Sequence, residues 1–179
     1  MRWRSLSMIP ALLVAVAALA AGPQPFTLTS NAFGRGQPIP ARFTCDGLSQ
    51  SPSLVWTDPP PRAKSIALVV DDPDAPRGTF THWLIWNLAP ASFALPDGVN
   101  RHREGIGDAE QGTNDFGKEG YGPPCPPPGK AHHYFFRVLA LSAPLELEAK
   151  ADRAAFDKAL KKVKVLGVAE FVGTYARAK

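Results

Sequence analysis

The sequence has few of the residue patterns that mark common catalytic chemistry. It contains two cysteines, Cys45 and Cys125, and no Cys-x-x-Cys or His-x-x-x-His pair. Zinc sites usually include such closely spaced ligands. A Gly-x-Ser-x-Gly segment, which carries the nucleophile of many serine hydrolases, is also absent. These absences argue against a zinc site of the common kind and against covalent catalysis by an activated serine.

The excess of positive over negative charge is small as well. The formal net charge is +4, and no basic stripe alternates with aromatic residues. Proteins that bind nucleic acid usually carry such a stripe, so no nucleic-acid partner is expected. There are no internal repeats and no low-complexity segment, which favours a single domain.

Only one long apolar run occurs, and it lies at the N-terminus. The run from Met8 to Leu19 follows two arginines, Arg2 and Arg4, and ends at the small residues of an Ala-Leu-Ala site. This pattern predicts a cleaved signal peptide over residues 1–20 and one periplasmic or secreted domain over residues 21–179. A membrane span needs roughly 20 apolar residues, so we expect no stable membrane insertion.

Export places the two cysteines in an oxidising compartment. We therefore favour a Cys45–Cys125 disulfide, with two free buried thiols as the alternative. The bridge would close a loop of about 80 residues and stabilise the fold by on the order of 4 kcal/mol.

Nineteen prolines and fifteen glycines, with one segment of helical period, predict a loop-rich β protein. Asp152 is the expected N-cap of that helix, whose apolar stripe continues to Val163. The segment Ile66–Val70 is apolar on both faces, which is typical of a central strand. The expected strands cover residues 26–29, 39–44, 53–56, 65–71, 80–88, 133–141 and 168–175.

Strand alternation then assigns side chains to faces. In the strand 80–88, His82 shares a face with Leu84, Trp86 and Leu88. In the later strand, His132 points the same way as Tyr134, and both point toward the space enclosed by the preceding loop.

Two proline-rich loops each precede a strand that begins with histidine. Asp71 to Pro76 leads to His82, and Gly120 to Gly129 leads to His132 and His133. Because proline fixes φ, these loops hold polar side chains with little motion. The distribution predicts one polar pocket built from two distant segments.

Three interpretations of that pocket are open. Asp72, Asp74, His82 and His132 could bind a metal in an assisted hydrolase. Alternatively, imidazole N–H groups, the Tyr134 hydroxyl and backbone N–H groups could bind a phosphate or carboxylate. In the third interpretation, the aspartates cap turns and the histidines are satisfied core residues.

An ordered set of motifs resembles the phosphatidylethanolamine-binding protein family, in its bacterial Raf-kinase-inhibitor-like branch. The motifs span nearly all of the expected mature chain: Phe43-Thr44-Cys45-Asp46-Gly47, Ser51-Pro52-Ser53-Leu54-Val55-Trp56, Asp72-Pro73-Asp74-Ala75-Pro76, His82-Trp83, Asn114-Asp115-Phe116-Gly117, Gly120-Tyr121-Gly122, Pro124-Cys125-Pro126-Pro127, His132-His133-Tyr134 and Ala169-Glu170-Phe171-Val172-Gly173-Thr174-Tyr175. A lone Asp-Pro-Asp would be weak evidence, whereas this order is specific.

The resemblance implies an all-β-dominated fold of two antiparallel sheets in a Greek-key sandwich, with a C-terminal helix. It implies a preformed pocket for phosphate or phosphorylethanolamine-type anions. The ligand-binding residues would be Asp72, Asp74, His82, His132 and Tyr134, and the pocket loops would include Pro76, Gly122, Pro124 and Pro126. The Ala75–Pro76 bond is a candidate for a cis peptide.

Two departures from the family pattern stand out. His133 replaces the usual arginine, on the strand face turned away from the pocket, and Pro123 replaces a glycine beside the pocket mouth. Taken together, the sequence predicts an exported, non-enzymatic binding protein without a cofactor or metal, whose partner is a small anion or a phospholipid headgroup. The alternatives are an inhibitor or signalling module with a protease or kinase target, and the metal-assisted hydrolase.

Overall fold

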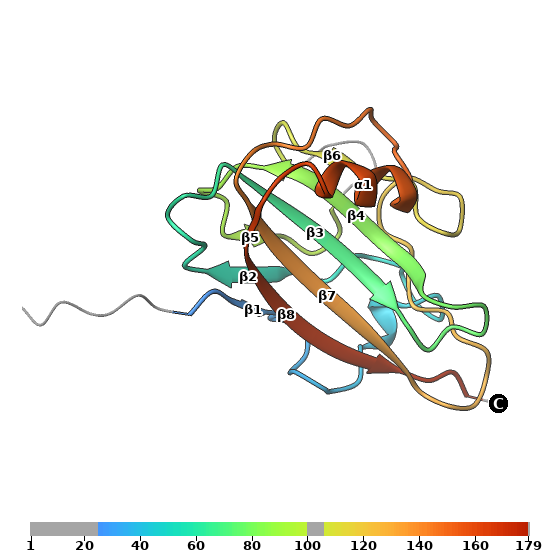
Figure 1. The fold of residues 1–179 in the computed structure, drawn as a ribbon. Helices are drawn as coiled ribbons and strands as arrows, with labels where there is room; N and C mark the ends of the chain where they lie inside the picture. The colour runs from blue at the N-terminus through green and yellow to red at the C-terminus, as the bar shows by residue number, and fades with distance from the viewer. Residues whose placement is uncertain (1–24, 100–105, 179) are drawn as a thin grey trace, which may run out of the picture.

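The computed structural model describes residues 25–99 and 106–178, so the expected signal peptide lies outside the described residues. The described chain is built mainly from strands, with one α-helix (Figure 1). Its elements are β1 (Thr27–Thr29), the 3-10 helix η1 (Ala41–Phe43), β2 (Leu54–Thr57), β3 (Ser65–Asp72), β4 (Phe80–Leu88), β5 (Ala94–Leu95), β6 (Glu110–Gln111), β7 (His132–Leu141), α1 (Arg153–Leu160) and β8 (Val165–Tyr175).

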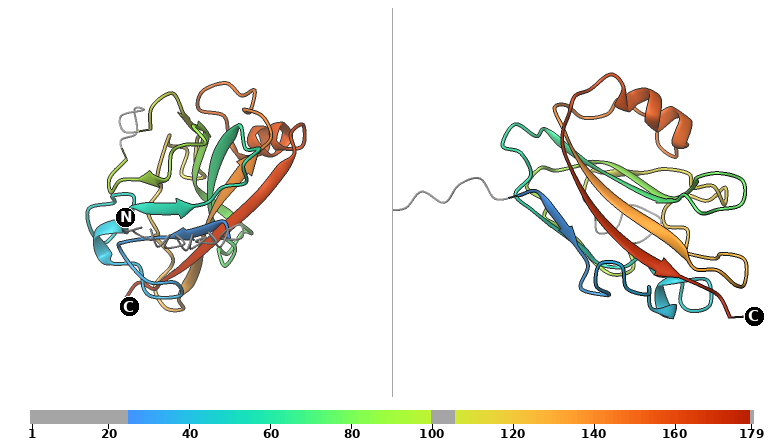
Figure 2. Two further views of the ribbon diagram at one scale, coloured as in Figure 1. Left: turned by 90° about the vertical axis from the view of Figure 1, so that its left-hand side faces the viewer. Right: turned by 60° about the horizontal axis from the view of Figure 1, so that its bottom comes forward.

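The strands form two antiparallel sheets, as the family resemblance implied. The smaller sheet has the order β1-β2-β5, and the larger has the order β6-β4-β3-β7-β8. The helix α1 covers the face of the large sheet that is turned away from the small one (Figure 2). The molecule therefore has three layers: a small sheet, a large sheet and one helix.

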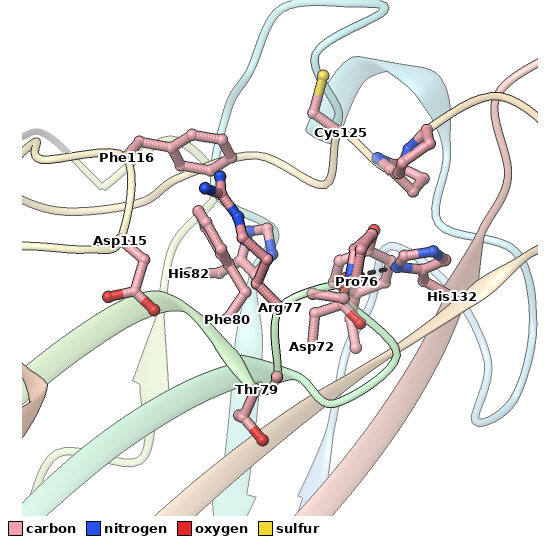
Figure 3. A pocket seen from close by; sticks show the side chains of 15 residues that line it. Asp72, Pro76, Arg77, Thr79, Phe80, His82, Asp115, Phe116, Cys125 and His132 are labelled. Atoms are coloured by element: carbon pink, nitrogen blue, oxygen red, sulfur yellow. Dashed lines mark hydrogen bonds and ion pairs between the residues drawn. The ribbon is translucent and has the colours of Figure 1, made fainter.

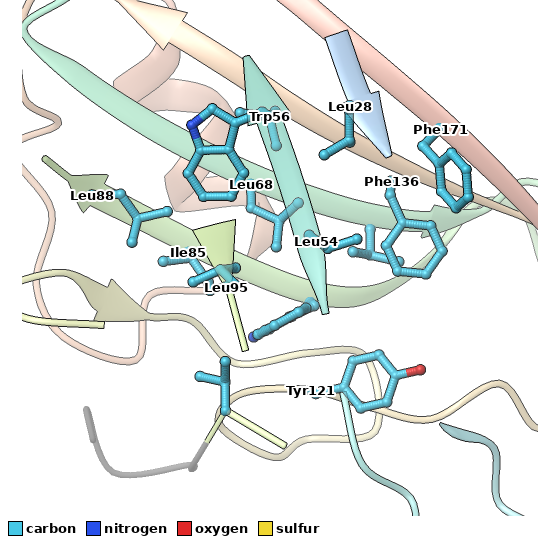
Figure 4. Close-up of a cluster of buried hydrophobic side chains, with 14 of the residues drawn as sticks. Leu28, Leu54, Trp56, Leu68, Ile85, Leu88, Leu95, Tyr121, Phe136 and Phe171 are labelled. Carbon is cyan, nitrogen blue, oxygen red and sulfur yellow. The ribbon is translucent and has the colours of Figure 1, made fainter. Parts of the chain in front are cut away.

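The strand β3 is at the centre of the large sheet, between β4 and β7. All of its residues are buried. Ile66, Leu68 and Val70 pack against the small sheet in the main core (Figure 4), while Ala67 and Val69 pack in the cluster beneath α1. The prediction of a central strand with two apolar faces is confirmed.

The alternation predicted for β4 is wrong at both ends because the strand contains two irregularities. Leu84 and Trp86 do face α1, but Leu88 packs in the main core with Ile85. The pairing with β3 shifts by one residue before Leu88, next to Asn87, whose φ is 63°. An extra residue in one strand reverses the side-chain alternation beyond it.

The second shift in β4 lies at His82. Val70 pairs with Trp83, whereas the next residue of β3, Asp71, pairs with Thr81. His82 is the extra residue of this bulge. It therefore turns to the same side as Trp83 instead of joining Leu84 beneath the helix.

Two smaller expectations also need correction. Residues 39–44 do not form a strand: Ile39 donates a backbone hydrogen bond to Thr174, and the chain then enters η1. Pro38 and Pro40 have no N–H to give to a strand ladder. The helix α1 begins at the predicted cap, where the Asp152 side chain accepts from the N–H of Ala155, but it ends at Leu160 rather than near Val163.

Cys45 and Cys125 form the predicted disulfide, with their Cα atoms 5.4 Å apart. The backbone N–H of Cys45 also donates to the carbonyl of Pro124, at 3.1 Å. The bridge fixes the proline-rich segment after Tyr121 to the turn that follows η1. This segment forms one wall of the cavity described next.

Candidate functional site

A pocket of about 570 Å³ opens at one end of the large sheet, where β3 ends and where β4 and β7 begin. Figure 3 shows Phe80, His82 and Phe116 on one side of it, with Pro76 and His132 on the other. Its polar lining residues are Asp72, Arg77, Thr79, His82, Asp115, His132 and Tyr134, and its apolar ones include Pro76, Phe80, Phe116, Pro126 and Pro127. The two loop-strand junctions singled out in the sequence therefore do meet.

The polar side of the pocket is organised around Asp72. One carboxylate oxygen lies 2.7 Å from Nδ1 of His132, and the other accepts the backbone N–H of Asp74 at 2.8 Å. Both side chains of the Asp72–His132 pair are at least nine-tenths buried. Because its Nδ1 is held by a carboxylate, the His132 ring has a fixed orientation.

His82 is fixed by two hydrogen bonds to Gly122. Its Nδ1 lies 2.8 Å from the Gly122 carbonyl oxygen, and the Gly122 N–H donates to the His82 carbonyl at 2.7 Å. Phe80, Phe116 and Tyr134 surround the imidazole at ring-centroid distances of 5.0, 5.6 and 5.2 Å. Burial among these rings lowers the pKa of His82, against the opposing effect of the Gly122 hydrogen bond and of nearby aspartates.

Tyr134 contributes a hydroxyl that is buried and has no hydrogen-bond partner among the described residues. The side chain is fully buried and belongs to the pocket wall. Burial, followed by the nearby Asp72 carboxylate, raises the pKa of this phenol, so the hydroxyl keeps its proton. A buried donor without an acceptor is costly, and such donors in native proteins require an explanation.

Asp74 does not belong to the pocket wall, although the sequence grouped it with Asp72. Its carboxylate accepts from the backbone N–H of His133 at 2.9 Å and lies 2.7 Å from that residue's Nδ1. These hydrogen bonds lower the pKa of Asp74. His133 is exposed on the outer face of β7, as predicted. Asp74 thus anchors the loop to the outside of the sheet.

The expectation of a cis Ala75–Pro76 bond is wrong, since no peptide bond in the described segments is cis. The N–H of Gly78 donates to the carbonyl of Ala75, which makes residues 75–78 a turn with Pro76 at its second position. A trans proline is favoured at that position because its fixed φ matches the turn. Pro76 does line the pocket, as predicted.

Of the other three predicted loop residues, one lines the pocket and two do not. Pro126 lines the pocket, whereas Gly122 and Pro124 do not. Gly122 instead supports His82, and a Cβ atom there would lie 2.6 Å from the Phe116 ring. Pro124 is buried behind the wall, where its carbonyl receives the Cys45 N–H.

Sequence reasoning missed the aromatic side of the pocket. Phe80 and Phe116 meet edge-on at 4.7 Å, and Phe116 is 43% exposed despite its size. Asp115 also lines the pocket and accepts the Thr81 N–H at 2.6 Å. Asp115 and Phe116 are positioned by a turn at Asn114. The buried Asn114 side chain accepts a hydrogen bond from the Phe116 N–H and donates one to the Gly120 carbonyl.

Metal binding receives no geometric support in the part of the chain that the structure describes. No three histidine, cysteine, aspartate or glutamate side chains gather there as metal ligands. Asp72 is occupied by His132 and a backbone N–H, and Asp74 by His133. Likewise, no helix within the described ranges is long and apolar enough to span a membrane.

Comparison with known proteins agrees with this architecture. The family model described as phosphatidylethanolamine-binding protein matches residues 29–176, and the chain belongs to that family. Two UPF0098 proteins are close in sequence. One, from Pyrococcus abyssi, is 38% identical over 173 residues, covering 93% of this chain and 94% of the relative. The other, from Methanothermobacter thermautotrophicus, is 44% identical over 150 residues, covering 84% and 98%.

Two crystal structures have the same fold. A phosphatidylethanolamine-binding protein homologue from Chlamydia trachomatis superposes with a TM-score of 0.77 at 38% identity, covering 85% of this chain and 97% of its own. YbcL of E. coli, described as a new member of the mammalian family, gives a TM-score of 0.80 at 33% identity, covering 85% and 98%.

Proposed function

We propose that this protein is an exported, non-enzymatic binding protein whose pocket takes a small oxyanion, such as inorganic phosphate or the phosphate of phosphorylethanolamine. The observation that carries the proposal is the unpartnered Tyr134 hydroxyl in the wall that also contains His82 and the Asp72–His132 pair. An oxyanion accepts hydrogen bonds from a phenol and from an imidazole held by a carboxylate.

The size and shape of the pocket support a small ligand. Ligand sites in proteins are usually preformed cavities of roughly 300–1,000 Å³ with a few converging polar groups. Here both imidazoles are fixed by a partner: His132 by Asp72, and His82 by Gly122. Fixed groups lose little conformational entropy on binding, so a small ligand with few atoms is bound efficiently.

The pocket is poorly equipped for covalent catalysis. Its one cysteine, Cys125, is bonded to Cys45 and has no thiolate to offer. No serine lines the pocket in the described parts of the chain. Binding alone accounts for the groups that are present, and for that reason we propose a non-enzymatic role.

Isothermal titration of the mature protein with phosphate, phosphorylethanolamine and acetate tests the proposal. We expect saturable one-to-one binding of at least one of these anions, weakened about tenfold or more in His132→Ala, which loses a donor to a charged acceptor. The matched control is His133→Ala, which removes an exposed imidazole from the next residue on the opposite strand face. Absence of binding heat with all three anions, in buffers of two different ionisation enthalpies, would refute the proposal.

The export part of the proposal depends on residues 1–20, which only the sequence addresses. Expression of the full chain in a bacterial host, followed by periplasmic extraction and intact-mass measurement, tests it directly. We expect a periplasmic product that begins at Ala21. A cytoplasmic product of full mass would contradict export and would leave the pocket proposal standing.

A further inference from the structure

The orientation of His82 determines which of its ring nitrogens carries the proton. Nδ1 lies 2.8 Å from the carbonyl oxygen of Gly122. A carbonyl oxygen only accepts, so Nδ1 must be the donor. In the neutral ring, Nε2 is then an unprotonated acceptor, on a side chain that lines the pocket.

The surroundings of His82 keep the ring neutral at ordinary pH. Three aromatic rings surround it, and burial lowers its pKa more than the Gly122 hydrogen bond and nearby carboxylates raise it. The charged and titratable groups near it are Asp71 and Asp72 from β3, Asp115 from the loop after β6, His132 and Tyr134 from β7, and Arg77 from the loop before β4. Of these, Asp72 is already hydrogen-bonded to His132, and Asp71 is paired with the Arg153 guanidinium.

The pocket therefore offers a mixed set of groups. Tyr134 is a donor, and His132 becomes a donor at Nε2 when it is protonated against Asp72. His82 is an acceptor. A fully deprotonated oxyanion has only acceptors, so it would place one of its charged oxygens against the lone pair of His82 or leave that nitrogen unpaired. An anion with an O–H group satisfies both kinds of partner.

We propose that the pocket selects protonated oxyanions, and that His82 recognises the proton by accepting a hydrogen bond from the O–H group of the ligand. This rests on the proposed function and narrows it to a ligand class. Inorganic phosphate keeps an O–H group at neutral pH, and a phosphomonoester gains one as the pH falls toward its second pKa of about 6. A phosphodiester, as in an intact phospholipid, has no such group, and neither does sulfate, which has nearly the same size and shape as phosphate. The occupant is thus a free phosphate or a monoester rather than an intact lipid headgroup.

The test compares matched ligands on the wild-type mature protein by titration calorimetry. Phosphate is compared with sulfate at pH 7.5. Phosphorylethanolamine is compared with glycerophosphorylethanolamine at pH 6, where about half of the monoester carries a proton and the diester carries none. We expect each protonated ligand to bind roughly 10- to 100-fold more tightly than its partner, the effect of one unsatisfied buried acceptor. The second pair separates a free headgroup from a lipid-derived diester.

A variant assigns the selectivity to one atom. His82→Asn retains an N–H for the Gly122 carbonyl and has nothing at the position of Nε2. We expect the phosphate-to-sulfate ratio to fall to within about threefold in this variant, with its folding verified by thermal unfolding.

Each outcome has a distinct meaning. Equal affinity of the wild type for phosphate and sulfate overturns the selectivity and leaves the binding function intact. No binding of any anion overturns the proposed function itself. Undiminished discrimination in a folded His82→Asn protein overturns the assignment to His82.

Discussion

The unpartnered hydroxyl of Tyr134 makes an unusual prediction: its removal should stabilise the empty protein. In Tyr134→Phe, a buried donor without an acceptor is replaced by hydrogen in a side chain of the same shape. Leaving such a donor unsatisfied costs about 1–3 kcal/mol. For a domain of about 150 residues, 1 kcal/mol corresponds to about 2–4 °C in melting temperature. We therefore expect the variant to unfold about 2–12 °C higher in phosphate-free buffer.

Phosphate should reverse the order of the melting temperatures of the wild type and the variant. If the hydroxyl donates to the bound anion, its loss removes a hydrogen bond to a charged acceptor and weakens binding about 10- to 100-fold. Saturating phosphate then raises the melting temperature of the wild type more than that of the variant. Differential scanning calorimetry over a series of phosphate concentrations measures both effects in one experiment.

Tyr121→Phe is the matched control. Tyr121 is also buried, but its hydroxyl donates to the Phe43 carbonyl at 2.9 Å. Its removal should lower the melting temperature, by about 1 kcal/mol of stability, without any effect on phosphate binding. A Tyr134→Phe protein that melts lower than wild type in phosphate-free buffer would refute the reasoning, since the hydroxyl would then have a stabilising partner in the empty pocket.

Three further predictions concern stability. Replacement of Cys45 and Cys125 by serine should lower the free energy of unfolding in urea by about 4 kcal/mol, and a loss below about 1 kcal/mol would contradict the loop-entropy account. Because burial lowers the pKa of His82 below its ordinary 6.5, the unfolded chain binds a proton there that the folded chain does not. The free energy of unfolding should fall as the pH drops through 6.5, and His82→Asn should flatten that dependence; parallel pH profiles would contradict this. Arg153→Met should cost about 2–3 kcal/mol in the same urea assay, because it deprives the buried Asp71 of its main cation, and an unchanged midpoint would show that Arg137 suffices.

Much of the fold could be predicted from local pattern. The apolar run at Ile66–Val70 identified the central strand, because a strand buried on both faces needs apolar residues throughout. Asp152 identified the start of the helix, because a free N–H in the first turn needs a side-chain acceptor. Alternation in β7 correctly placed His132 and Tyr134 on one face, since that half of the strand pairs without a shift.

The rest depended on contacts that no local pattern records. Alternation placed His82 on the same strand face as Leu84 and Trp86, and only the bulge at that residue turns it into the pocket. Such a bulge arises from pairing with a neighbouring strand and with Asp115, which are distant in sequence. Asp74 resembled Asp72 in its motif, yet the turn at Pro73 directs it to His133 on the outer surface.

The central position of β3 has a consequence for how the chain folds when it emerges into its compartment N-terminus first. β3 can pair with β4 early, but its other edge pairs with β7, which comes much later in the chain. Asp71, for example, has its pairing partner Phe135 in β7. Until this part of the chain emerges, one edge of the central strand has no hydrogen-bonding partner, and Cys45 has no partner thiol. Such late pairing slows folding and prolongs the time in which strand edges are open to aggregation. Asp72 likewise gains His132 only when β7 has emerged, so the pocket is among the last parts of the molecule to form.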